Sequence, residues 1–266
     1  MSNKAQSRRD FIKKTATASA LLATGTVLPQ FTAKSYERIM GANERIQVSM
    51  MGVNGRGTSL AQNFAMQHNC DVIHVCDVDI RALSKCMTAI EDKQSIKAKS
   101  FVDFRKSLES KDVDALVIAA PDHWHAPASL LAMQAGKHVY VEKPCSHNPK
   151  EGEILVEAAN RYKKVIQMGN QRRSWPNVVE GIKAVQNGVI GRVYFGKGWY
   201  SNNRQSIGIG KYTTPPEWFN WDLWQGPAPR KKFKDNLIHY NWHWHWHWGT
   251  GEALNNGTHM IDLLRW

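Results

Sequence analysis

From residue 45 onward, short apolar runs alternate with longer segments whose apolar residues recur at helical spacing. The apolar runs, which predict buried strands, are Ile46–Met51, Val72–Cys76, Val113–Ala120, Lys137–Val141 and Val165–Met168. The segments with helical spacing include Thr58–His68, Asp79–Ile90 and Lys150–Tyr162. Strands that alternate with helices in this way predict an α/β fold, with a doubly wound parallel sheet covered by helices on both faces.

Turn-forming residues mark several element ends in this half. Phe101–Leu108 predicts a short strand edge followed by a turn. Pro127 stands where a first helical turn accepts proline, and Gly136 stands where a helix ends. We therefore expect a helix between these two residues.

The regular alternation ends near residue 170. Trp175–Gln186 predicts a helix that begins with proline, and Val193–Tyr200 alternates enough to predict a long strand that opens a new sheet. Residues 201–240 are rich in Pro, Trp and Asn and have little periodicity, whereas Asn256–Arg265 again has helical spacing. A second domain of a different kind is therefore predicted after residue 170.

Tryptophan is concentrated in this second half. Seven of the eleven tryptophans lie between Trp218 and Trp248, and Trp242–Trp248 alternates strictly between Trp and His. On a strand this alternation would place indoles on one face and imidazoles on the other. Its three histidines would lie roughly 7 Å apart per step, too far to converge on one ion, so no metal site is predicted. A tryptophan face packed in the core and an aromatic platform for a carbohydrate both stay open.

The first strand runs into a glycine turn that is followed by a helical segment. Such a turn lets backbone N–H groups approach a diphosphate, and the N-terminus of the helix faces the anion. Asn54 stands where a middle glycine is usual. The residues expected to hold the diphosphate are Gly52, Asn54, Gly55, Arg56 and Gly57.

An acidic residue ends the second strand. Asp77 follows Gly57 by twenty residues, the distance at which a carboxylate would hold the ribose diol of a dinucleotide. The acid favours NAD, while Arg56 and Arg81 leave NADP possible. An ordinary turn between strand and helix is the alternative.

Loops after the later strands also carry reactive side chains, and ligands of such sheets bind beyond the carboxyl ends of the strands. Pro121–His125 brings two imidazoles and an indole, and Asn170–Arg173 brings two arginines that could bind a sugar acid or a phosphate. Lys143, close to a cationic nicotinamide, would be driven toward its neutral form and could exchange a proton with a hydroxyl. Solvated surface side chains are the alternative for each of these residues.

Composition and charge narrow the class of protein. The chain has 266 residues, 42% of them hydrophobic, which is enough for a full core. Of the formal charge of +12, residues 1–40 contribute +5, and no Lys/Arg block with interleaved aromatics dominates the rest. Nucleic acid is therefore not a predicted partner. The four cysteines form no CxxC pair, so zinc is not indicated.

The first residues have the form of an export signal. Ser7–Lys13 contains twin arginines followed by Phe-Ile-Lys, and the apolar run Ala16–Leu28 comes next. That run is too short to stay in a bilayer, and the pattern resembles a twin-arginine signal. This route exports folded proteins, so it suits an enzyme that takes up its dinucleotide before reaching the periplasm. A basic tail without a sorting role is the alternative.

Taken together, Gly52–Gly57, Asp77, Pro121–His125 and the run GKHVYVEKP at Gly136–Pro144 resemble the Gfo/Idh/MocA family of NAD(P)-dependent oxidoreductases. The signal and the Trp-rich stretch resemble the exported bacterial members. The resemblance implies a signal and linker at 1–40, a Rossmann domain at 41–170, and at 171–266 an incomplete α+β domain with an open, mostly antiparallel sheet. Because family members continue well past residue 266, we expect a C-terminally truncated chain with an exposed apolar face. We also expect the full-length protein to be a homo-oligomer.

The resemblance also implies roles for single residues. Lys143 would touch nicotinamide and substrate, Glu142 would lie beside the nicotinamide ribose, and Pro121 and His125 would line the cofactor cleft. Gly249–Asp262 resembles the family's GGG…D-x-G-x-H-x-x-D motif, which makes His259 the general acid/base. The expected substrate ligands are Trp124, Gln171, Arg172, Asn255 and His259.

Asn255 departs from the family pattern, because the family has an Asp at this position. An amide cannot take a proton, so a sugar hydroxyl ligand is the expected role of Asn255. His259 would lie in the first turn of its helix, where the helix N-terminus lowers the pKa of an imidazole.

The function predicted from these residues is an NAD-dependent sugar oxidoreductase with a tightly bound cofactor. An NAD-dependent glycoside hydrolase that oxidises its sugar transiently is a second hypothesis. A non-catalytic sugar- or NAD-binding protein is a third.

Overall fold

The computed structural model describes residues 45–266, and the segment predicted to be an export signal lies outside the described residues. Six strands form one sheet in the order β3-β2-β1-β4-β5-β6, and every neighbouring pair is parallel. The strands are β1 Ile46–Met51, β2 Cys70–Cys76, β3 Lys99–Phe101, β4 Ala115–Ile118, β5 His138–Glu142 and β6 Ile166–Gly169. The predicted doubly wound parallel sheet is confirmed.

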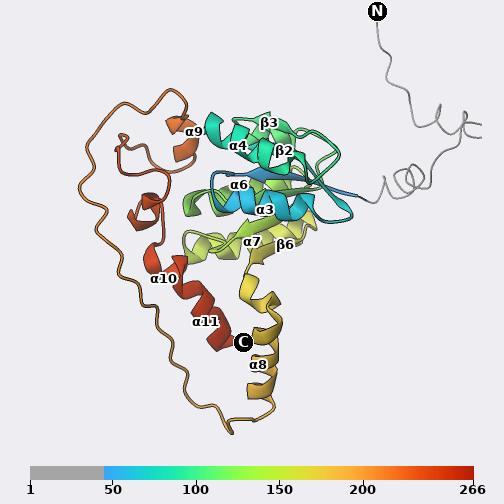
Figure 1. The fold of residues 1–266 in the computed structure, drawn as a ribbon, viewed down its shortest axis with the longest axis vertical. Helices are drawn as coiled ribbons and strands as arrows, with labels where there is room; N and C mark the ends of the chain where they lie inside the picture. Colours follow the sequence, from blue (N-terminus) through green and yellow to red (C-terminus); the bar gives the residue numbers. More distant parts are fainter. Residues whose placement is uncertain (1–44) are drawn as a thin grey trace, which may run out of the picture. The chain divides into compact units, whose positions relative to one another are not determined.

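Five helices cover the two faces of this sheet (Figure 1). They are α3 Arg56–Ala65, α4 Ile80–Glu91, α5 Phe104–Leu108, α6 Asp122–Gln134 and α7 Pro149–Tyr162. Alternate strand residues face opposite sides of the sheet. Met50 of β1 accordingly packs in the cluster that contains residues of α3 and α4, whereas Met51 packs in the cluster that contains residues of α5, α6 and α7.

The chain order creates a crevice at one edge of the sheet. From β1 the chain builds β2 and β3 on one side, and then crosses over to build β4, β5 and β6 on the other. The loop after β1 leads to α3 on one face of the sheet and the loop after β4 leads to α6 on the other, so the two loops diverge. This switch point is where sheets of this kind bind their ligands.

Two local predictions in this half are wrong. The turn expected within Phe101–Leu108 is the helix α5, which forms because the Asp103 side chain accepts from the backbone N–H of Arg105 at 3.0 Å and caps the helix. Pro127 lies inside α6 rather than in its first turn, because α6 already begins after Pro121. Gly136 ends this helix as predicted, with a positive φ of 79°.

Residues 171–266 contain short helices and long irregular segments. The helical elements are η2 Gln171–Ser174, α8 Pro176–Gln186, α9 Trp221–Gln225, η3 Asn241–Trp244, α10 Gly251–Asn255 and α11 Gly257–Arg265. The predicted helices at Trp175–Gln186 and Asn256–Arg265 correspond to α8 and α11. Strand pairing in this part is limited to two isolated bridges, so within the described residues the expected second sheet is not formed.

The strand predicted at Val193–Tyr200 is one of the differences. This segment has no regular structure, and Tyr194 is 92% exposed. Gly196 and Gly198 lie directly against the Leu264 and Met260 side chains of α11. A helix offers no free backbone edge, so the segment lacks the neighbour that a strand requires.

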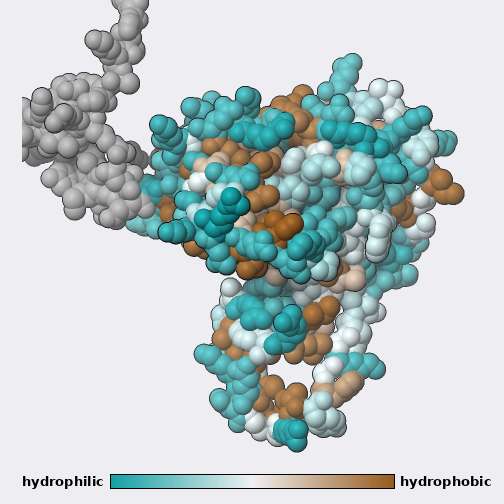
Figure 2. All heavy atoms as spheres, turned by 180° about the vertical axis from the view of Figure 1, so that it is seen from behind, coloured by the Kyte–Doolittle hydropathy of each residue, from teal (hydrophilic) through white to brown (hydrophobic). Residues whose placement is uncertain are grey.

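The segment from Val189 to Tyr200 exposes several large apolar side chains. In Figure 2, apolar residues are visible at the end of the molecule that contains α8 and this segment. The most exposed are Val189, Ile190, Tyr194, Phe195 and Trp199. Apolar side chains are thus exposed near Val193, but on an irregular segment and not on the sheet that the sequence predicted.

The alternating run Trp242–Trp248 is not a strand either. It begins in the 3-10 helix η3 and continues in turns, in which the N–H of Trp248 donates to the carbonyl of His245 at 2.8 Å. Because turns rotate successive side chains, the indoles do not share a face: Trp248 is buried while Trp246 is 93% exposed. Among the described residues, no three His, Cys, Asp or Glu side chains are placed to share a metal ion.

The buried tryptophans of this part form a third core cluster. Its buried members are Phe219, Trp224, Phe233, Leu237, Trp242 and Trp248. We refer to residues 218–248 as the aromatic belt. It is attached to the loop after β2, where the N–H of Ile80 donates to the carbonyl of Trp218 at 3.2 Å and Asp79 bridges to Phe219. No helix within the described residues combines the length and apolar character that a membrane-spanning helix requires.

Candidate functional site

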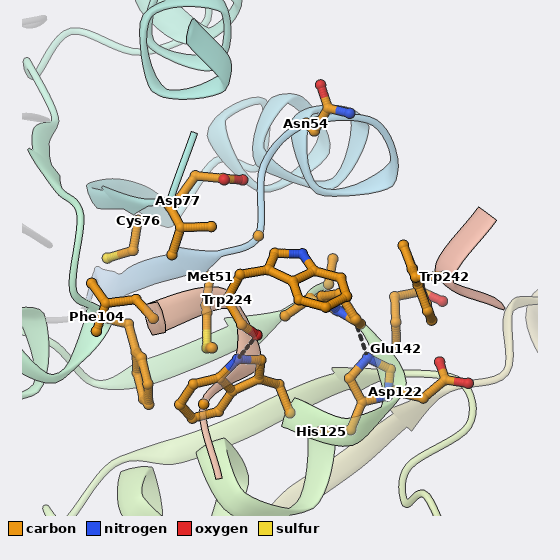
Figure 3. Close-up of a pocket in the computed structure, with 18 of the residues that line it drawn as sticks. Met51, Asn54, Cys76, Asp77, Phe104, Asp122, His125, Glu142, Trp224 and Trp242 are labelled. Carbon is orange, nitrogen blue, oxygen red and sulfur yellow. Dashed lines mark hydrogen bonds between the residues drawn. The ribbon is translucent and has the colours of Figure 1, made fainter. Parts of the chain in front are cut away.

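A cavity of about 780 Å³ lies at the carboxyl edge of the sheet, between the strand-end loops and the aromatic belt. In Figure 3, Asp77 lies toward one end of its lining and Glu142, Asp122 and His125 lie toward the other, with Trp224 between them. The cavity is lined by most of the residues predicted from the sequence: Gly52, Asn54, Gly55, Arg56, Asp77, Pro121, Trp124, His125, Glu142, Lys143, Gln171, Asn255 and His259.

Two predicted residues do not line the cavity. Gly57 packs beneath the turn, and Arg172 turns aside so that its guanidinium carbon lies 5.9 Å from the centre of the Trp175 ring. Successive residues of a 3-10 turn point about 120° apart, so when Gln171 faces the cavity Arg172 cannot. The charge of Arg172 is still close enough to lower the pKa of His259.

The glycine turn is closed by backbone contacts that exclude side chains. A Cβ on Gly57 would fall 1.8 Å from the carbonyl oxygen of Gly52, and one on Gly52 would fall 2.7 Å from the nitrogen of Ala120. A Cβ on Gly55 would meet nothing within 4 Å, which leaves open space on the cavity side. The turn therefore exposes backbone to a ligand without an intervening side chain, as a diphosphate cradle requires.

Asp77 lies next to this turn, as predicted. Its Oδ2 accepts from the N–H of Val53 at 2.6 Å, and its Oδ1 accepts from the N–H of Asp79 at 2.9 Å. Burial raises the pKa of the Asp77 carboxyl, and these two hydrogen bonds oppose that shift. A carboxylate in this position leaves lone pairs for the hydroxyls of a ribose.

An ion pair crosses the cavity between two strand ends. Arg56, at the start of α3, donates from Nε to Oε1 of Glu142, at the end of β5, at 2.7 Å. Glu142 is buried whereas Arg56 is half-exposed. The pair joins the glycine turn to the loop that carries Lys143.

Lys143, Asn255 and His259 converge at the other part of the cavity. Lys143 Nζ donates to the backbone carbonyl of Asn255 at 2.7 Å and lies 3.1 Å from its side-chain oxygen. Burial lowers the pKa of Lys143, against the opposing charges of Glu142 and Asp122. Burial also lowers the pKa of His259, and the positive charge of Lys143 lowers it further. The cavity thus holds an amine and an imidazole that are both drawn toward their neutral forms.

The imidazole of His125 is engaged within the protein and is not free to bind a ligand. It is 1% exposed, and its two ring nitrogens face the carbonyl oxygens of Pro144 and Ala120, the latter at 2.7 Å. The ring therefore ties the loop after β4 to the loop after β5. It borders the cavity as predicted, and its contacts hold the loop that contains Lys143.

Trp124 packs against the aromatic belt. Its Nε1 donates to the carbonyl of Trp224 at 2.9 Å, and a Cβ on Gly226 would fall 2.1 Å from its ring. The neighbouring His123 also contacts the Trp224 carbonyl at 2.9 Å. These contacts fix the belt over the end of β4.

Several lining residues were not predicted from the sequence. Asp122 is buried, and its Oδ2 accepts from Thr250 Oγ1 at 2.6 Å. His243 donates from Nδ1 to the carbonyl of Tyr240 at 2.6 Å, which fixes its neutral tautomer with Nε2 as the acceptor, and burial lowers its pKa. The Trp-His alternation was the only signal for His243. Trp224 was noted only as part of the Trp-rich stretch and Phe219 gave no signal, because their place in the cavity depends on how an irregular segment folds back.

Comparisons with known proteins agree with this geometry. Residues 46–170 match the family described as "Oxidoreductase family, NAD-binding Rossmann fold" (GFO_IDH_MocA). A "Glycosyl hydrolase family 109 protein" of Saccharopolyspora erythraea is 30% identical over 228 residues, which are 80% of this chain and 49% of that protein. "Glycosyl hydrolase family 109 protein 2" of Shewanella sp. (strain ANA-3) is 30% identical over 73% of this chain and 45% of its own length. The chain thus spans about half the length of the curated relatives that it matches.

Solved structures share the fold. Scyllo-inositol dehydrogenase from Lactobacillus casei, crystallised with bound cofactor NAD(H) and scyllo-inositol, is 23% identical with a TM-score of 0.51, covering 55% of this chain and 42% of that one. An NAD-binding protein from Listeria innocua is 22% identical with a TM-score of 0.55, covering 83% of this chain and 54% of that one. Together with the glycine turn and Asp77, the family match identifies residues 46–170 as an NAD-binding Rossmann domain that is similar to the domain of the Gfo/Idh/MocA oxidoreductase family.

Proposed function

We propose that this protein is an NAD-dependent oxidoreductase that moves a hydride between nicotinamide and a secondary hydroxyl of a sugar or sugar alcohol. The observation that carries the proposal is the meeting of Lys143, Asn255 and His259 in the same cavity as the glycine turn and Asp77. This arrangement supports a dinucleotide site with a proton-transfer site next to it.

The residues present fit the cofactor. The Gly52–Gly57 turn would hold the diphosphate by backbone N–H groups, Asp77 would hold the adenosine ribose, and Glu142 would lie beside the nicotinamide ribose. Bound NAD supplies a nicotinamide ring that accepts a hydride and can return it. Gln171 lines the cavity and has a buried side-chain oxygen without a hydrogen-bond partner, which leaves an acceptor for an amide or hydroxyl of a ligand.

The proton of the reacting hydroxyl would be handled by His259 and Lys143. An imidazole with a lowered pKa is neutral at pH 7 and can accept the hydroxyl proton as the C–H hydride departs. Lys143 would donate a hydrogen bond to the same oxygen, and the hydrogen bond to the Asn255 carbonyl holds Lys143 Nζ in place. Asn255 cannot relay a proton, so the proton leaves through His259.

Activity measurements on variants test this proposal. Purified protein would be given NAD with myo-inositol, scyllo-inositol and a panel of monosaccharides, and NADH formation would be followed by absorbance. We expect Lys143→Ala and His259→Ala each to lower kcat by about 100-fold or more, the range found for lost general acid–base groups. His247→Ala, which removes an imidazole bonded to Pro229 instead, is the matched control and should keep full activity. Equal activity in all three variants would contradict the proposal.

A second candidate is favoured by the names of the curated relatives, which are glycosyl hydrolases of family 109. In that case oxidation of the sugar is transient: it acidifies a neighbouring C–H, the glycosidic bond is eliminated, water adds, and the hydride returns. Release of p-nitrophenol from p-nitrophenyl glycosides without net NADH would identify this activity. Net NADH formation with free sugars would identify the dehydrogenase.

We also propose that the protein is exported by the twin-arginine route with its cofactor already bound and recycled in the site. The support is the sequence Ser7–Lys13 together with an NAD-binding domain, since the periplasm holds no NAD pool. Replacing Arg8 and Arg9 by Lys should keep the protein in the cytoplasmic fraction. Protein recovered from the periplasm without nucleotide, and active only with added NAD, would contradict the retained cofactor.

A further inference from the structure

One arginine near the adenosine end of the cavity is held away from it. Arg81 lies in the first turn of α4, four residues after Asp77. In dinucleotide-binding domains an acid here bonds the ribose 2′-hydroxyl of NAD, while a nearby arginine accommodates the 2′-phosphate of NADP. Arg81 is placed in the sequence to do the latter, yet it is absent from the cavity lining, which includes its neighbours Asp77 and Val78.

One edge and one face of the Arg81 guanidinium are occupied, although the side chain is 55% exposed. Its Nη2 and Nε donate to the two carboxylate oxygens of Asp79 at 3.0 and 3.1 Å, and Asp79 is 2% exposed. Its central carbon lies 3.2 Å above the centre of the Trp218 ring, a close cation–π contact. With its Nε–Nη2 edge on a carboxylate and one face on Trp218, the guanidinium is held in place outside the cavity lining, so it does not reach a phosphate beside Asp77.

The aromatic belt holds Trp218 in this place. Backbone hydrogen bonds join Ile80 to Trp218 and Asn220 to Val78, on both sides of the bridge between Asp79 and Phe219. The Trp218 ring also stacks on His239, whose Nε2 lies 2.9 Å from Asp79 Oδ2. The ring that covers Arg81 is therefore fixed to the same loop that carries Asp77.

The arginines that do line the cavity are engaged as well. Arg56 is paired with Glu142, Arg105 is paired with Asp103, and Arg230 donates to the carbonyl oxygens of Asp222 and Gly226. Asp77 meanwhile places a carboxylate next to the glycine turn. A 2′-phosphate entering beside Asp77 would meet a like charge and no arginine free to neutralise it.

We propose that Asp79 and Trp218 set the preference for NAD over NADP by withdrawing Arg81 from the ribose. Asp77 selects NAD by bonding the 2′-hydroxyl. The contacts of Arg81 with Asp79 and Trp218 keep away the positive charge that would otherwise neutralise a 2′-phosphate. Arg81 is thus a phosphate ligand that the aromatic belt keeps out of the cavity. The inference rests on the NAD site itself and not on the identity of the sugar.

Nucleotide affinities in a set of combined variants test the inference. The full chain would be titrated calorimetrically with NAD and with NADP, without any sugar. Asp77→Ser alone should weaken NAD binding about tenfold and leave NADP weak, because Arg81 stays on Trp218. Adding Trp218→Leu removes the ring that holds the guanidinium against Asp79, so that a 2′-phosphate can compete with Asp79 for it. NADP binding should then tighten about 10- to 100-fold, the effect of one charge-assisted pair. Adding Arg81→Ala to that double variant should erase the gain.

The matched control is Asp77→Ser combined with Trp246→Leu, which removes a 93% exposed indole in the same belt and should give no gain. The gain should also shrink with added salt, as a phosphate contact does. Should the Trp218→Leu protein lose its circular dichroism signal, Trp218→Phe keeps the aromatic packing and should give a smaller gain.

Two outcomes overturn the inference. One is NADP affinity in the double variant no higher than in Asp77→Ser. The other is a loss of NADP affinity when Arg81→Ala is added to Asp77→Ser alone, which would show that Arg81 already reaches the phosphate. Absence of sugar turnover would count against the proposed function and leave this cycle of affinities unaffected.

Discussion

Single residues in this protein gain their properties mainly from burial. His123 is an example: its ring lies 5.1 Å from the rings of both Trp224 and Trp248, and its nitrogens face their carbonyl oxygens. Burial lowers the pKa of His123 from 6.5 to about 4, although those carbonyls oppose the shift. The folded protein therefore keeps this imidazole neutral where the unfolded chain would protonate it.

This shift predicts a loss of stability in acid. Below pH 6.5 the unfolded chain binds a proton at His123 that the folded protein does not, so the free energy of unfolding falls as the pH drops from 6.5 toward 4. The full shift corresponds to about 3 kcal/mol. Urea unfolding at pH 7 and pH 4.5 should show a smaller drop for His123→Asn than for the unchanged protein. The exposed His68→Asn is the control, and an equal drop in both variants would refute the assignment.

At the scale of elements, the Rossmann half could be predicted from the sequence because its signals are local. Ile46–Met51 needs only its own apolar run to become β1, and the glycine turn needs only its own glycines. Asp77 and Lys143 were found because residues at the carboxyl ends of parallel strands meet at one edge. The pairing of neighbouring strands in the sheet brings these side chains together, although they are far apart in the sequence.

Two of the three glycines of the turn, Gly55 and Gly57, give a matched pair of variants. Gly57→Ala places a methyl group 1.8 Å from the Gly52 carbonyl oxygen, so either the turn or α3 must move. We expect the free energy of unfolding to fall by more than about 2 kcal/mol. We also expect NAD binding to be lost. Gly55→Ala meets nothing within 4 Å in the protein, and the φ of −111° lies outside the left-handed region that favours glycine. It should keep its stability but weaken NAD binding, because its methyl group enters the space for the diphosphate. Thermal unfolding and calorimetry separate the two effects, and equal stabilities would contradict the backbone contact.

At the scale of the whole molecule, the second half could not be predicted because its structure depends on distant contacts. Trp242–Trp248 has the alternation of a strand, yet its buried indoles pack with Phe219 and Phe233. Nothing near Trp218 in the sequence indicates that it covers Arg81. Val193–Tyr200 has the pattern of a strand but lies along α11 without a strand neighbour. An alternation of apolar and polar residues indicates which face of a segment is buried. A strand also needs a backbone partner, which only the rest of the fold supplies.

That unpaired segment predicts how the 266-residue chain behaves in solution. Tyr194, Phe195 and Trp199 are 92%, 72% and 74% exposed, and exposed apolar groups gathered on one segment favour association. We expect sedimentation velocity to show concentration-dependent oligomers or aggregates of the chain. Phe195→Ser with Trp199→Ser should shift the protein toward monomer without affecting NAD affinity, because neither residue lines the cavity. Val156→Ser, which removes a 63% exposed apolar side chain from α7, is the control and should leave the distribution unchanged. If the double variant associates as strongly as the original chain, the contacts responsible lie on another surface.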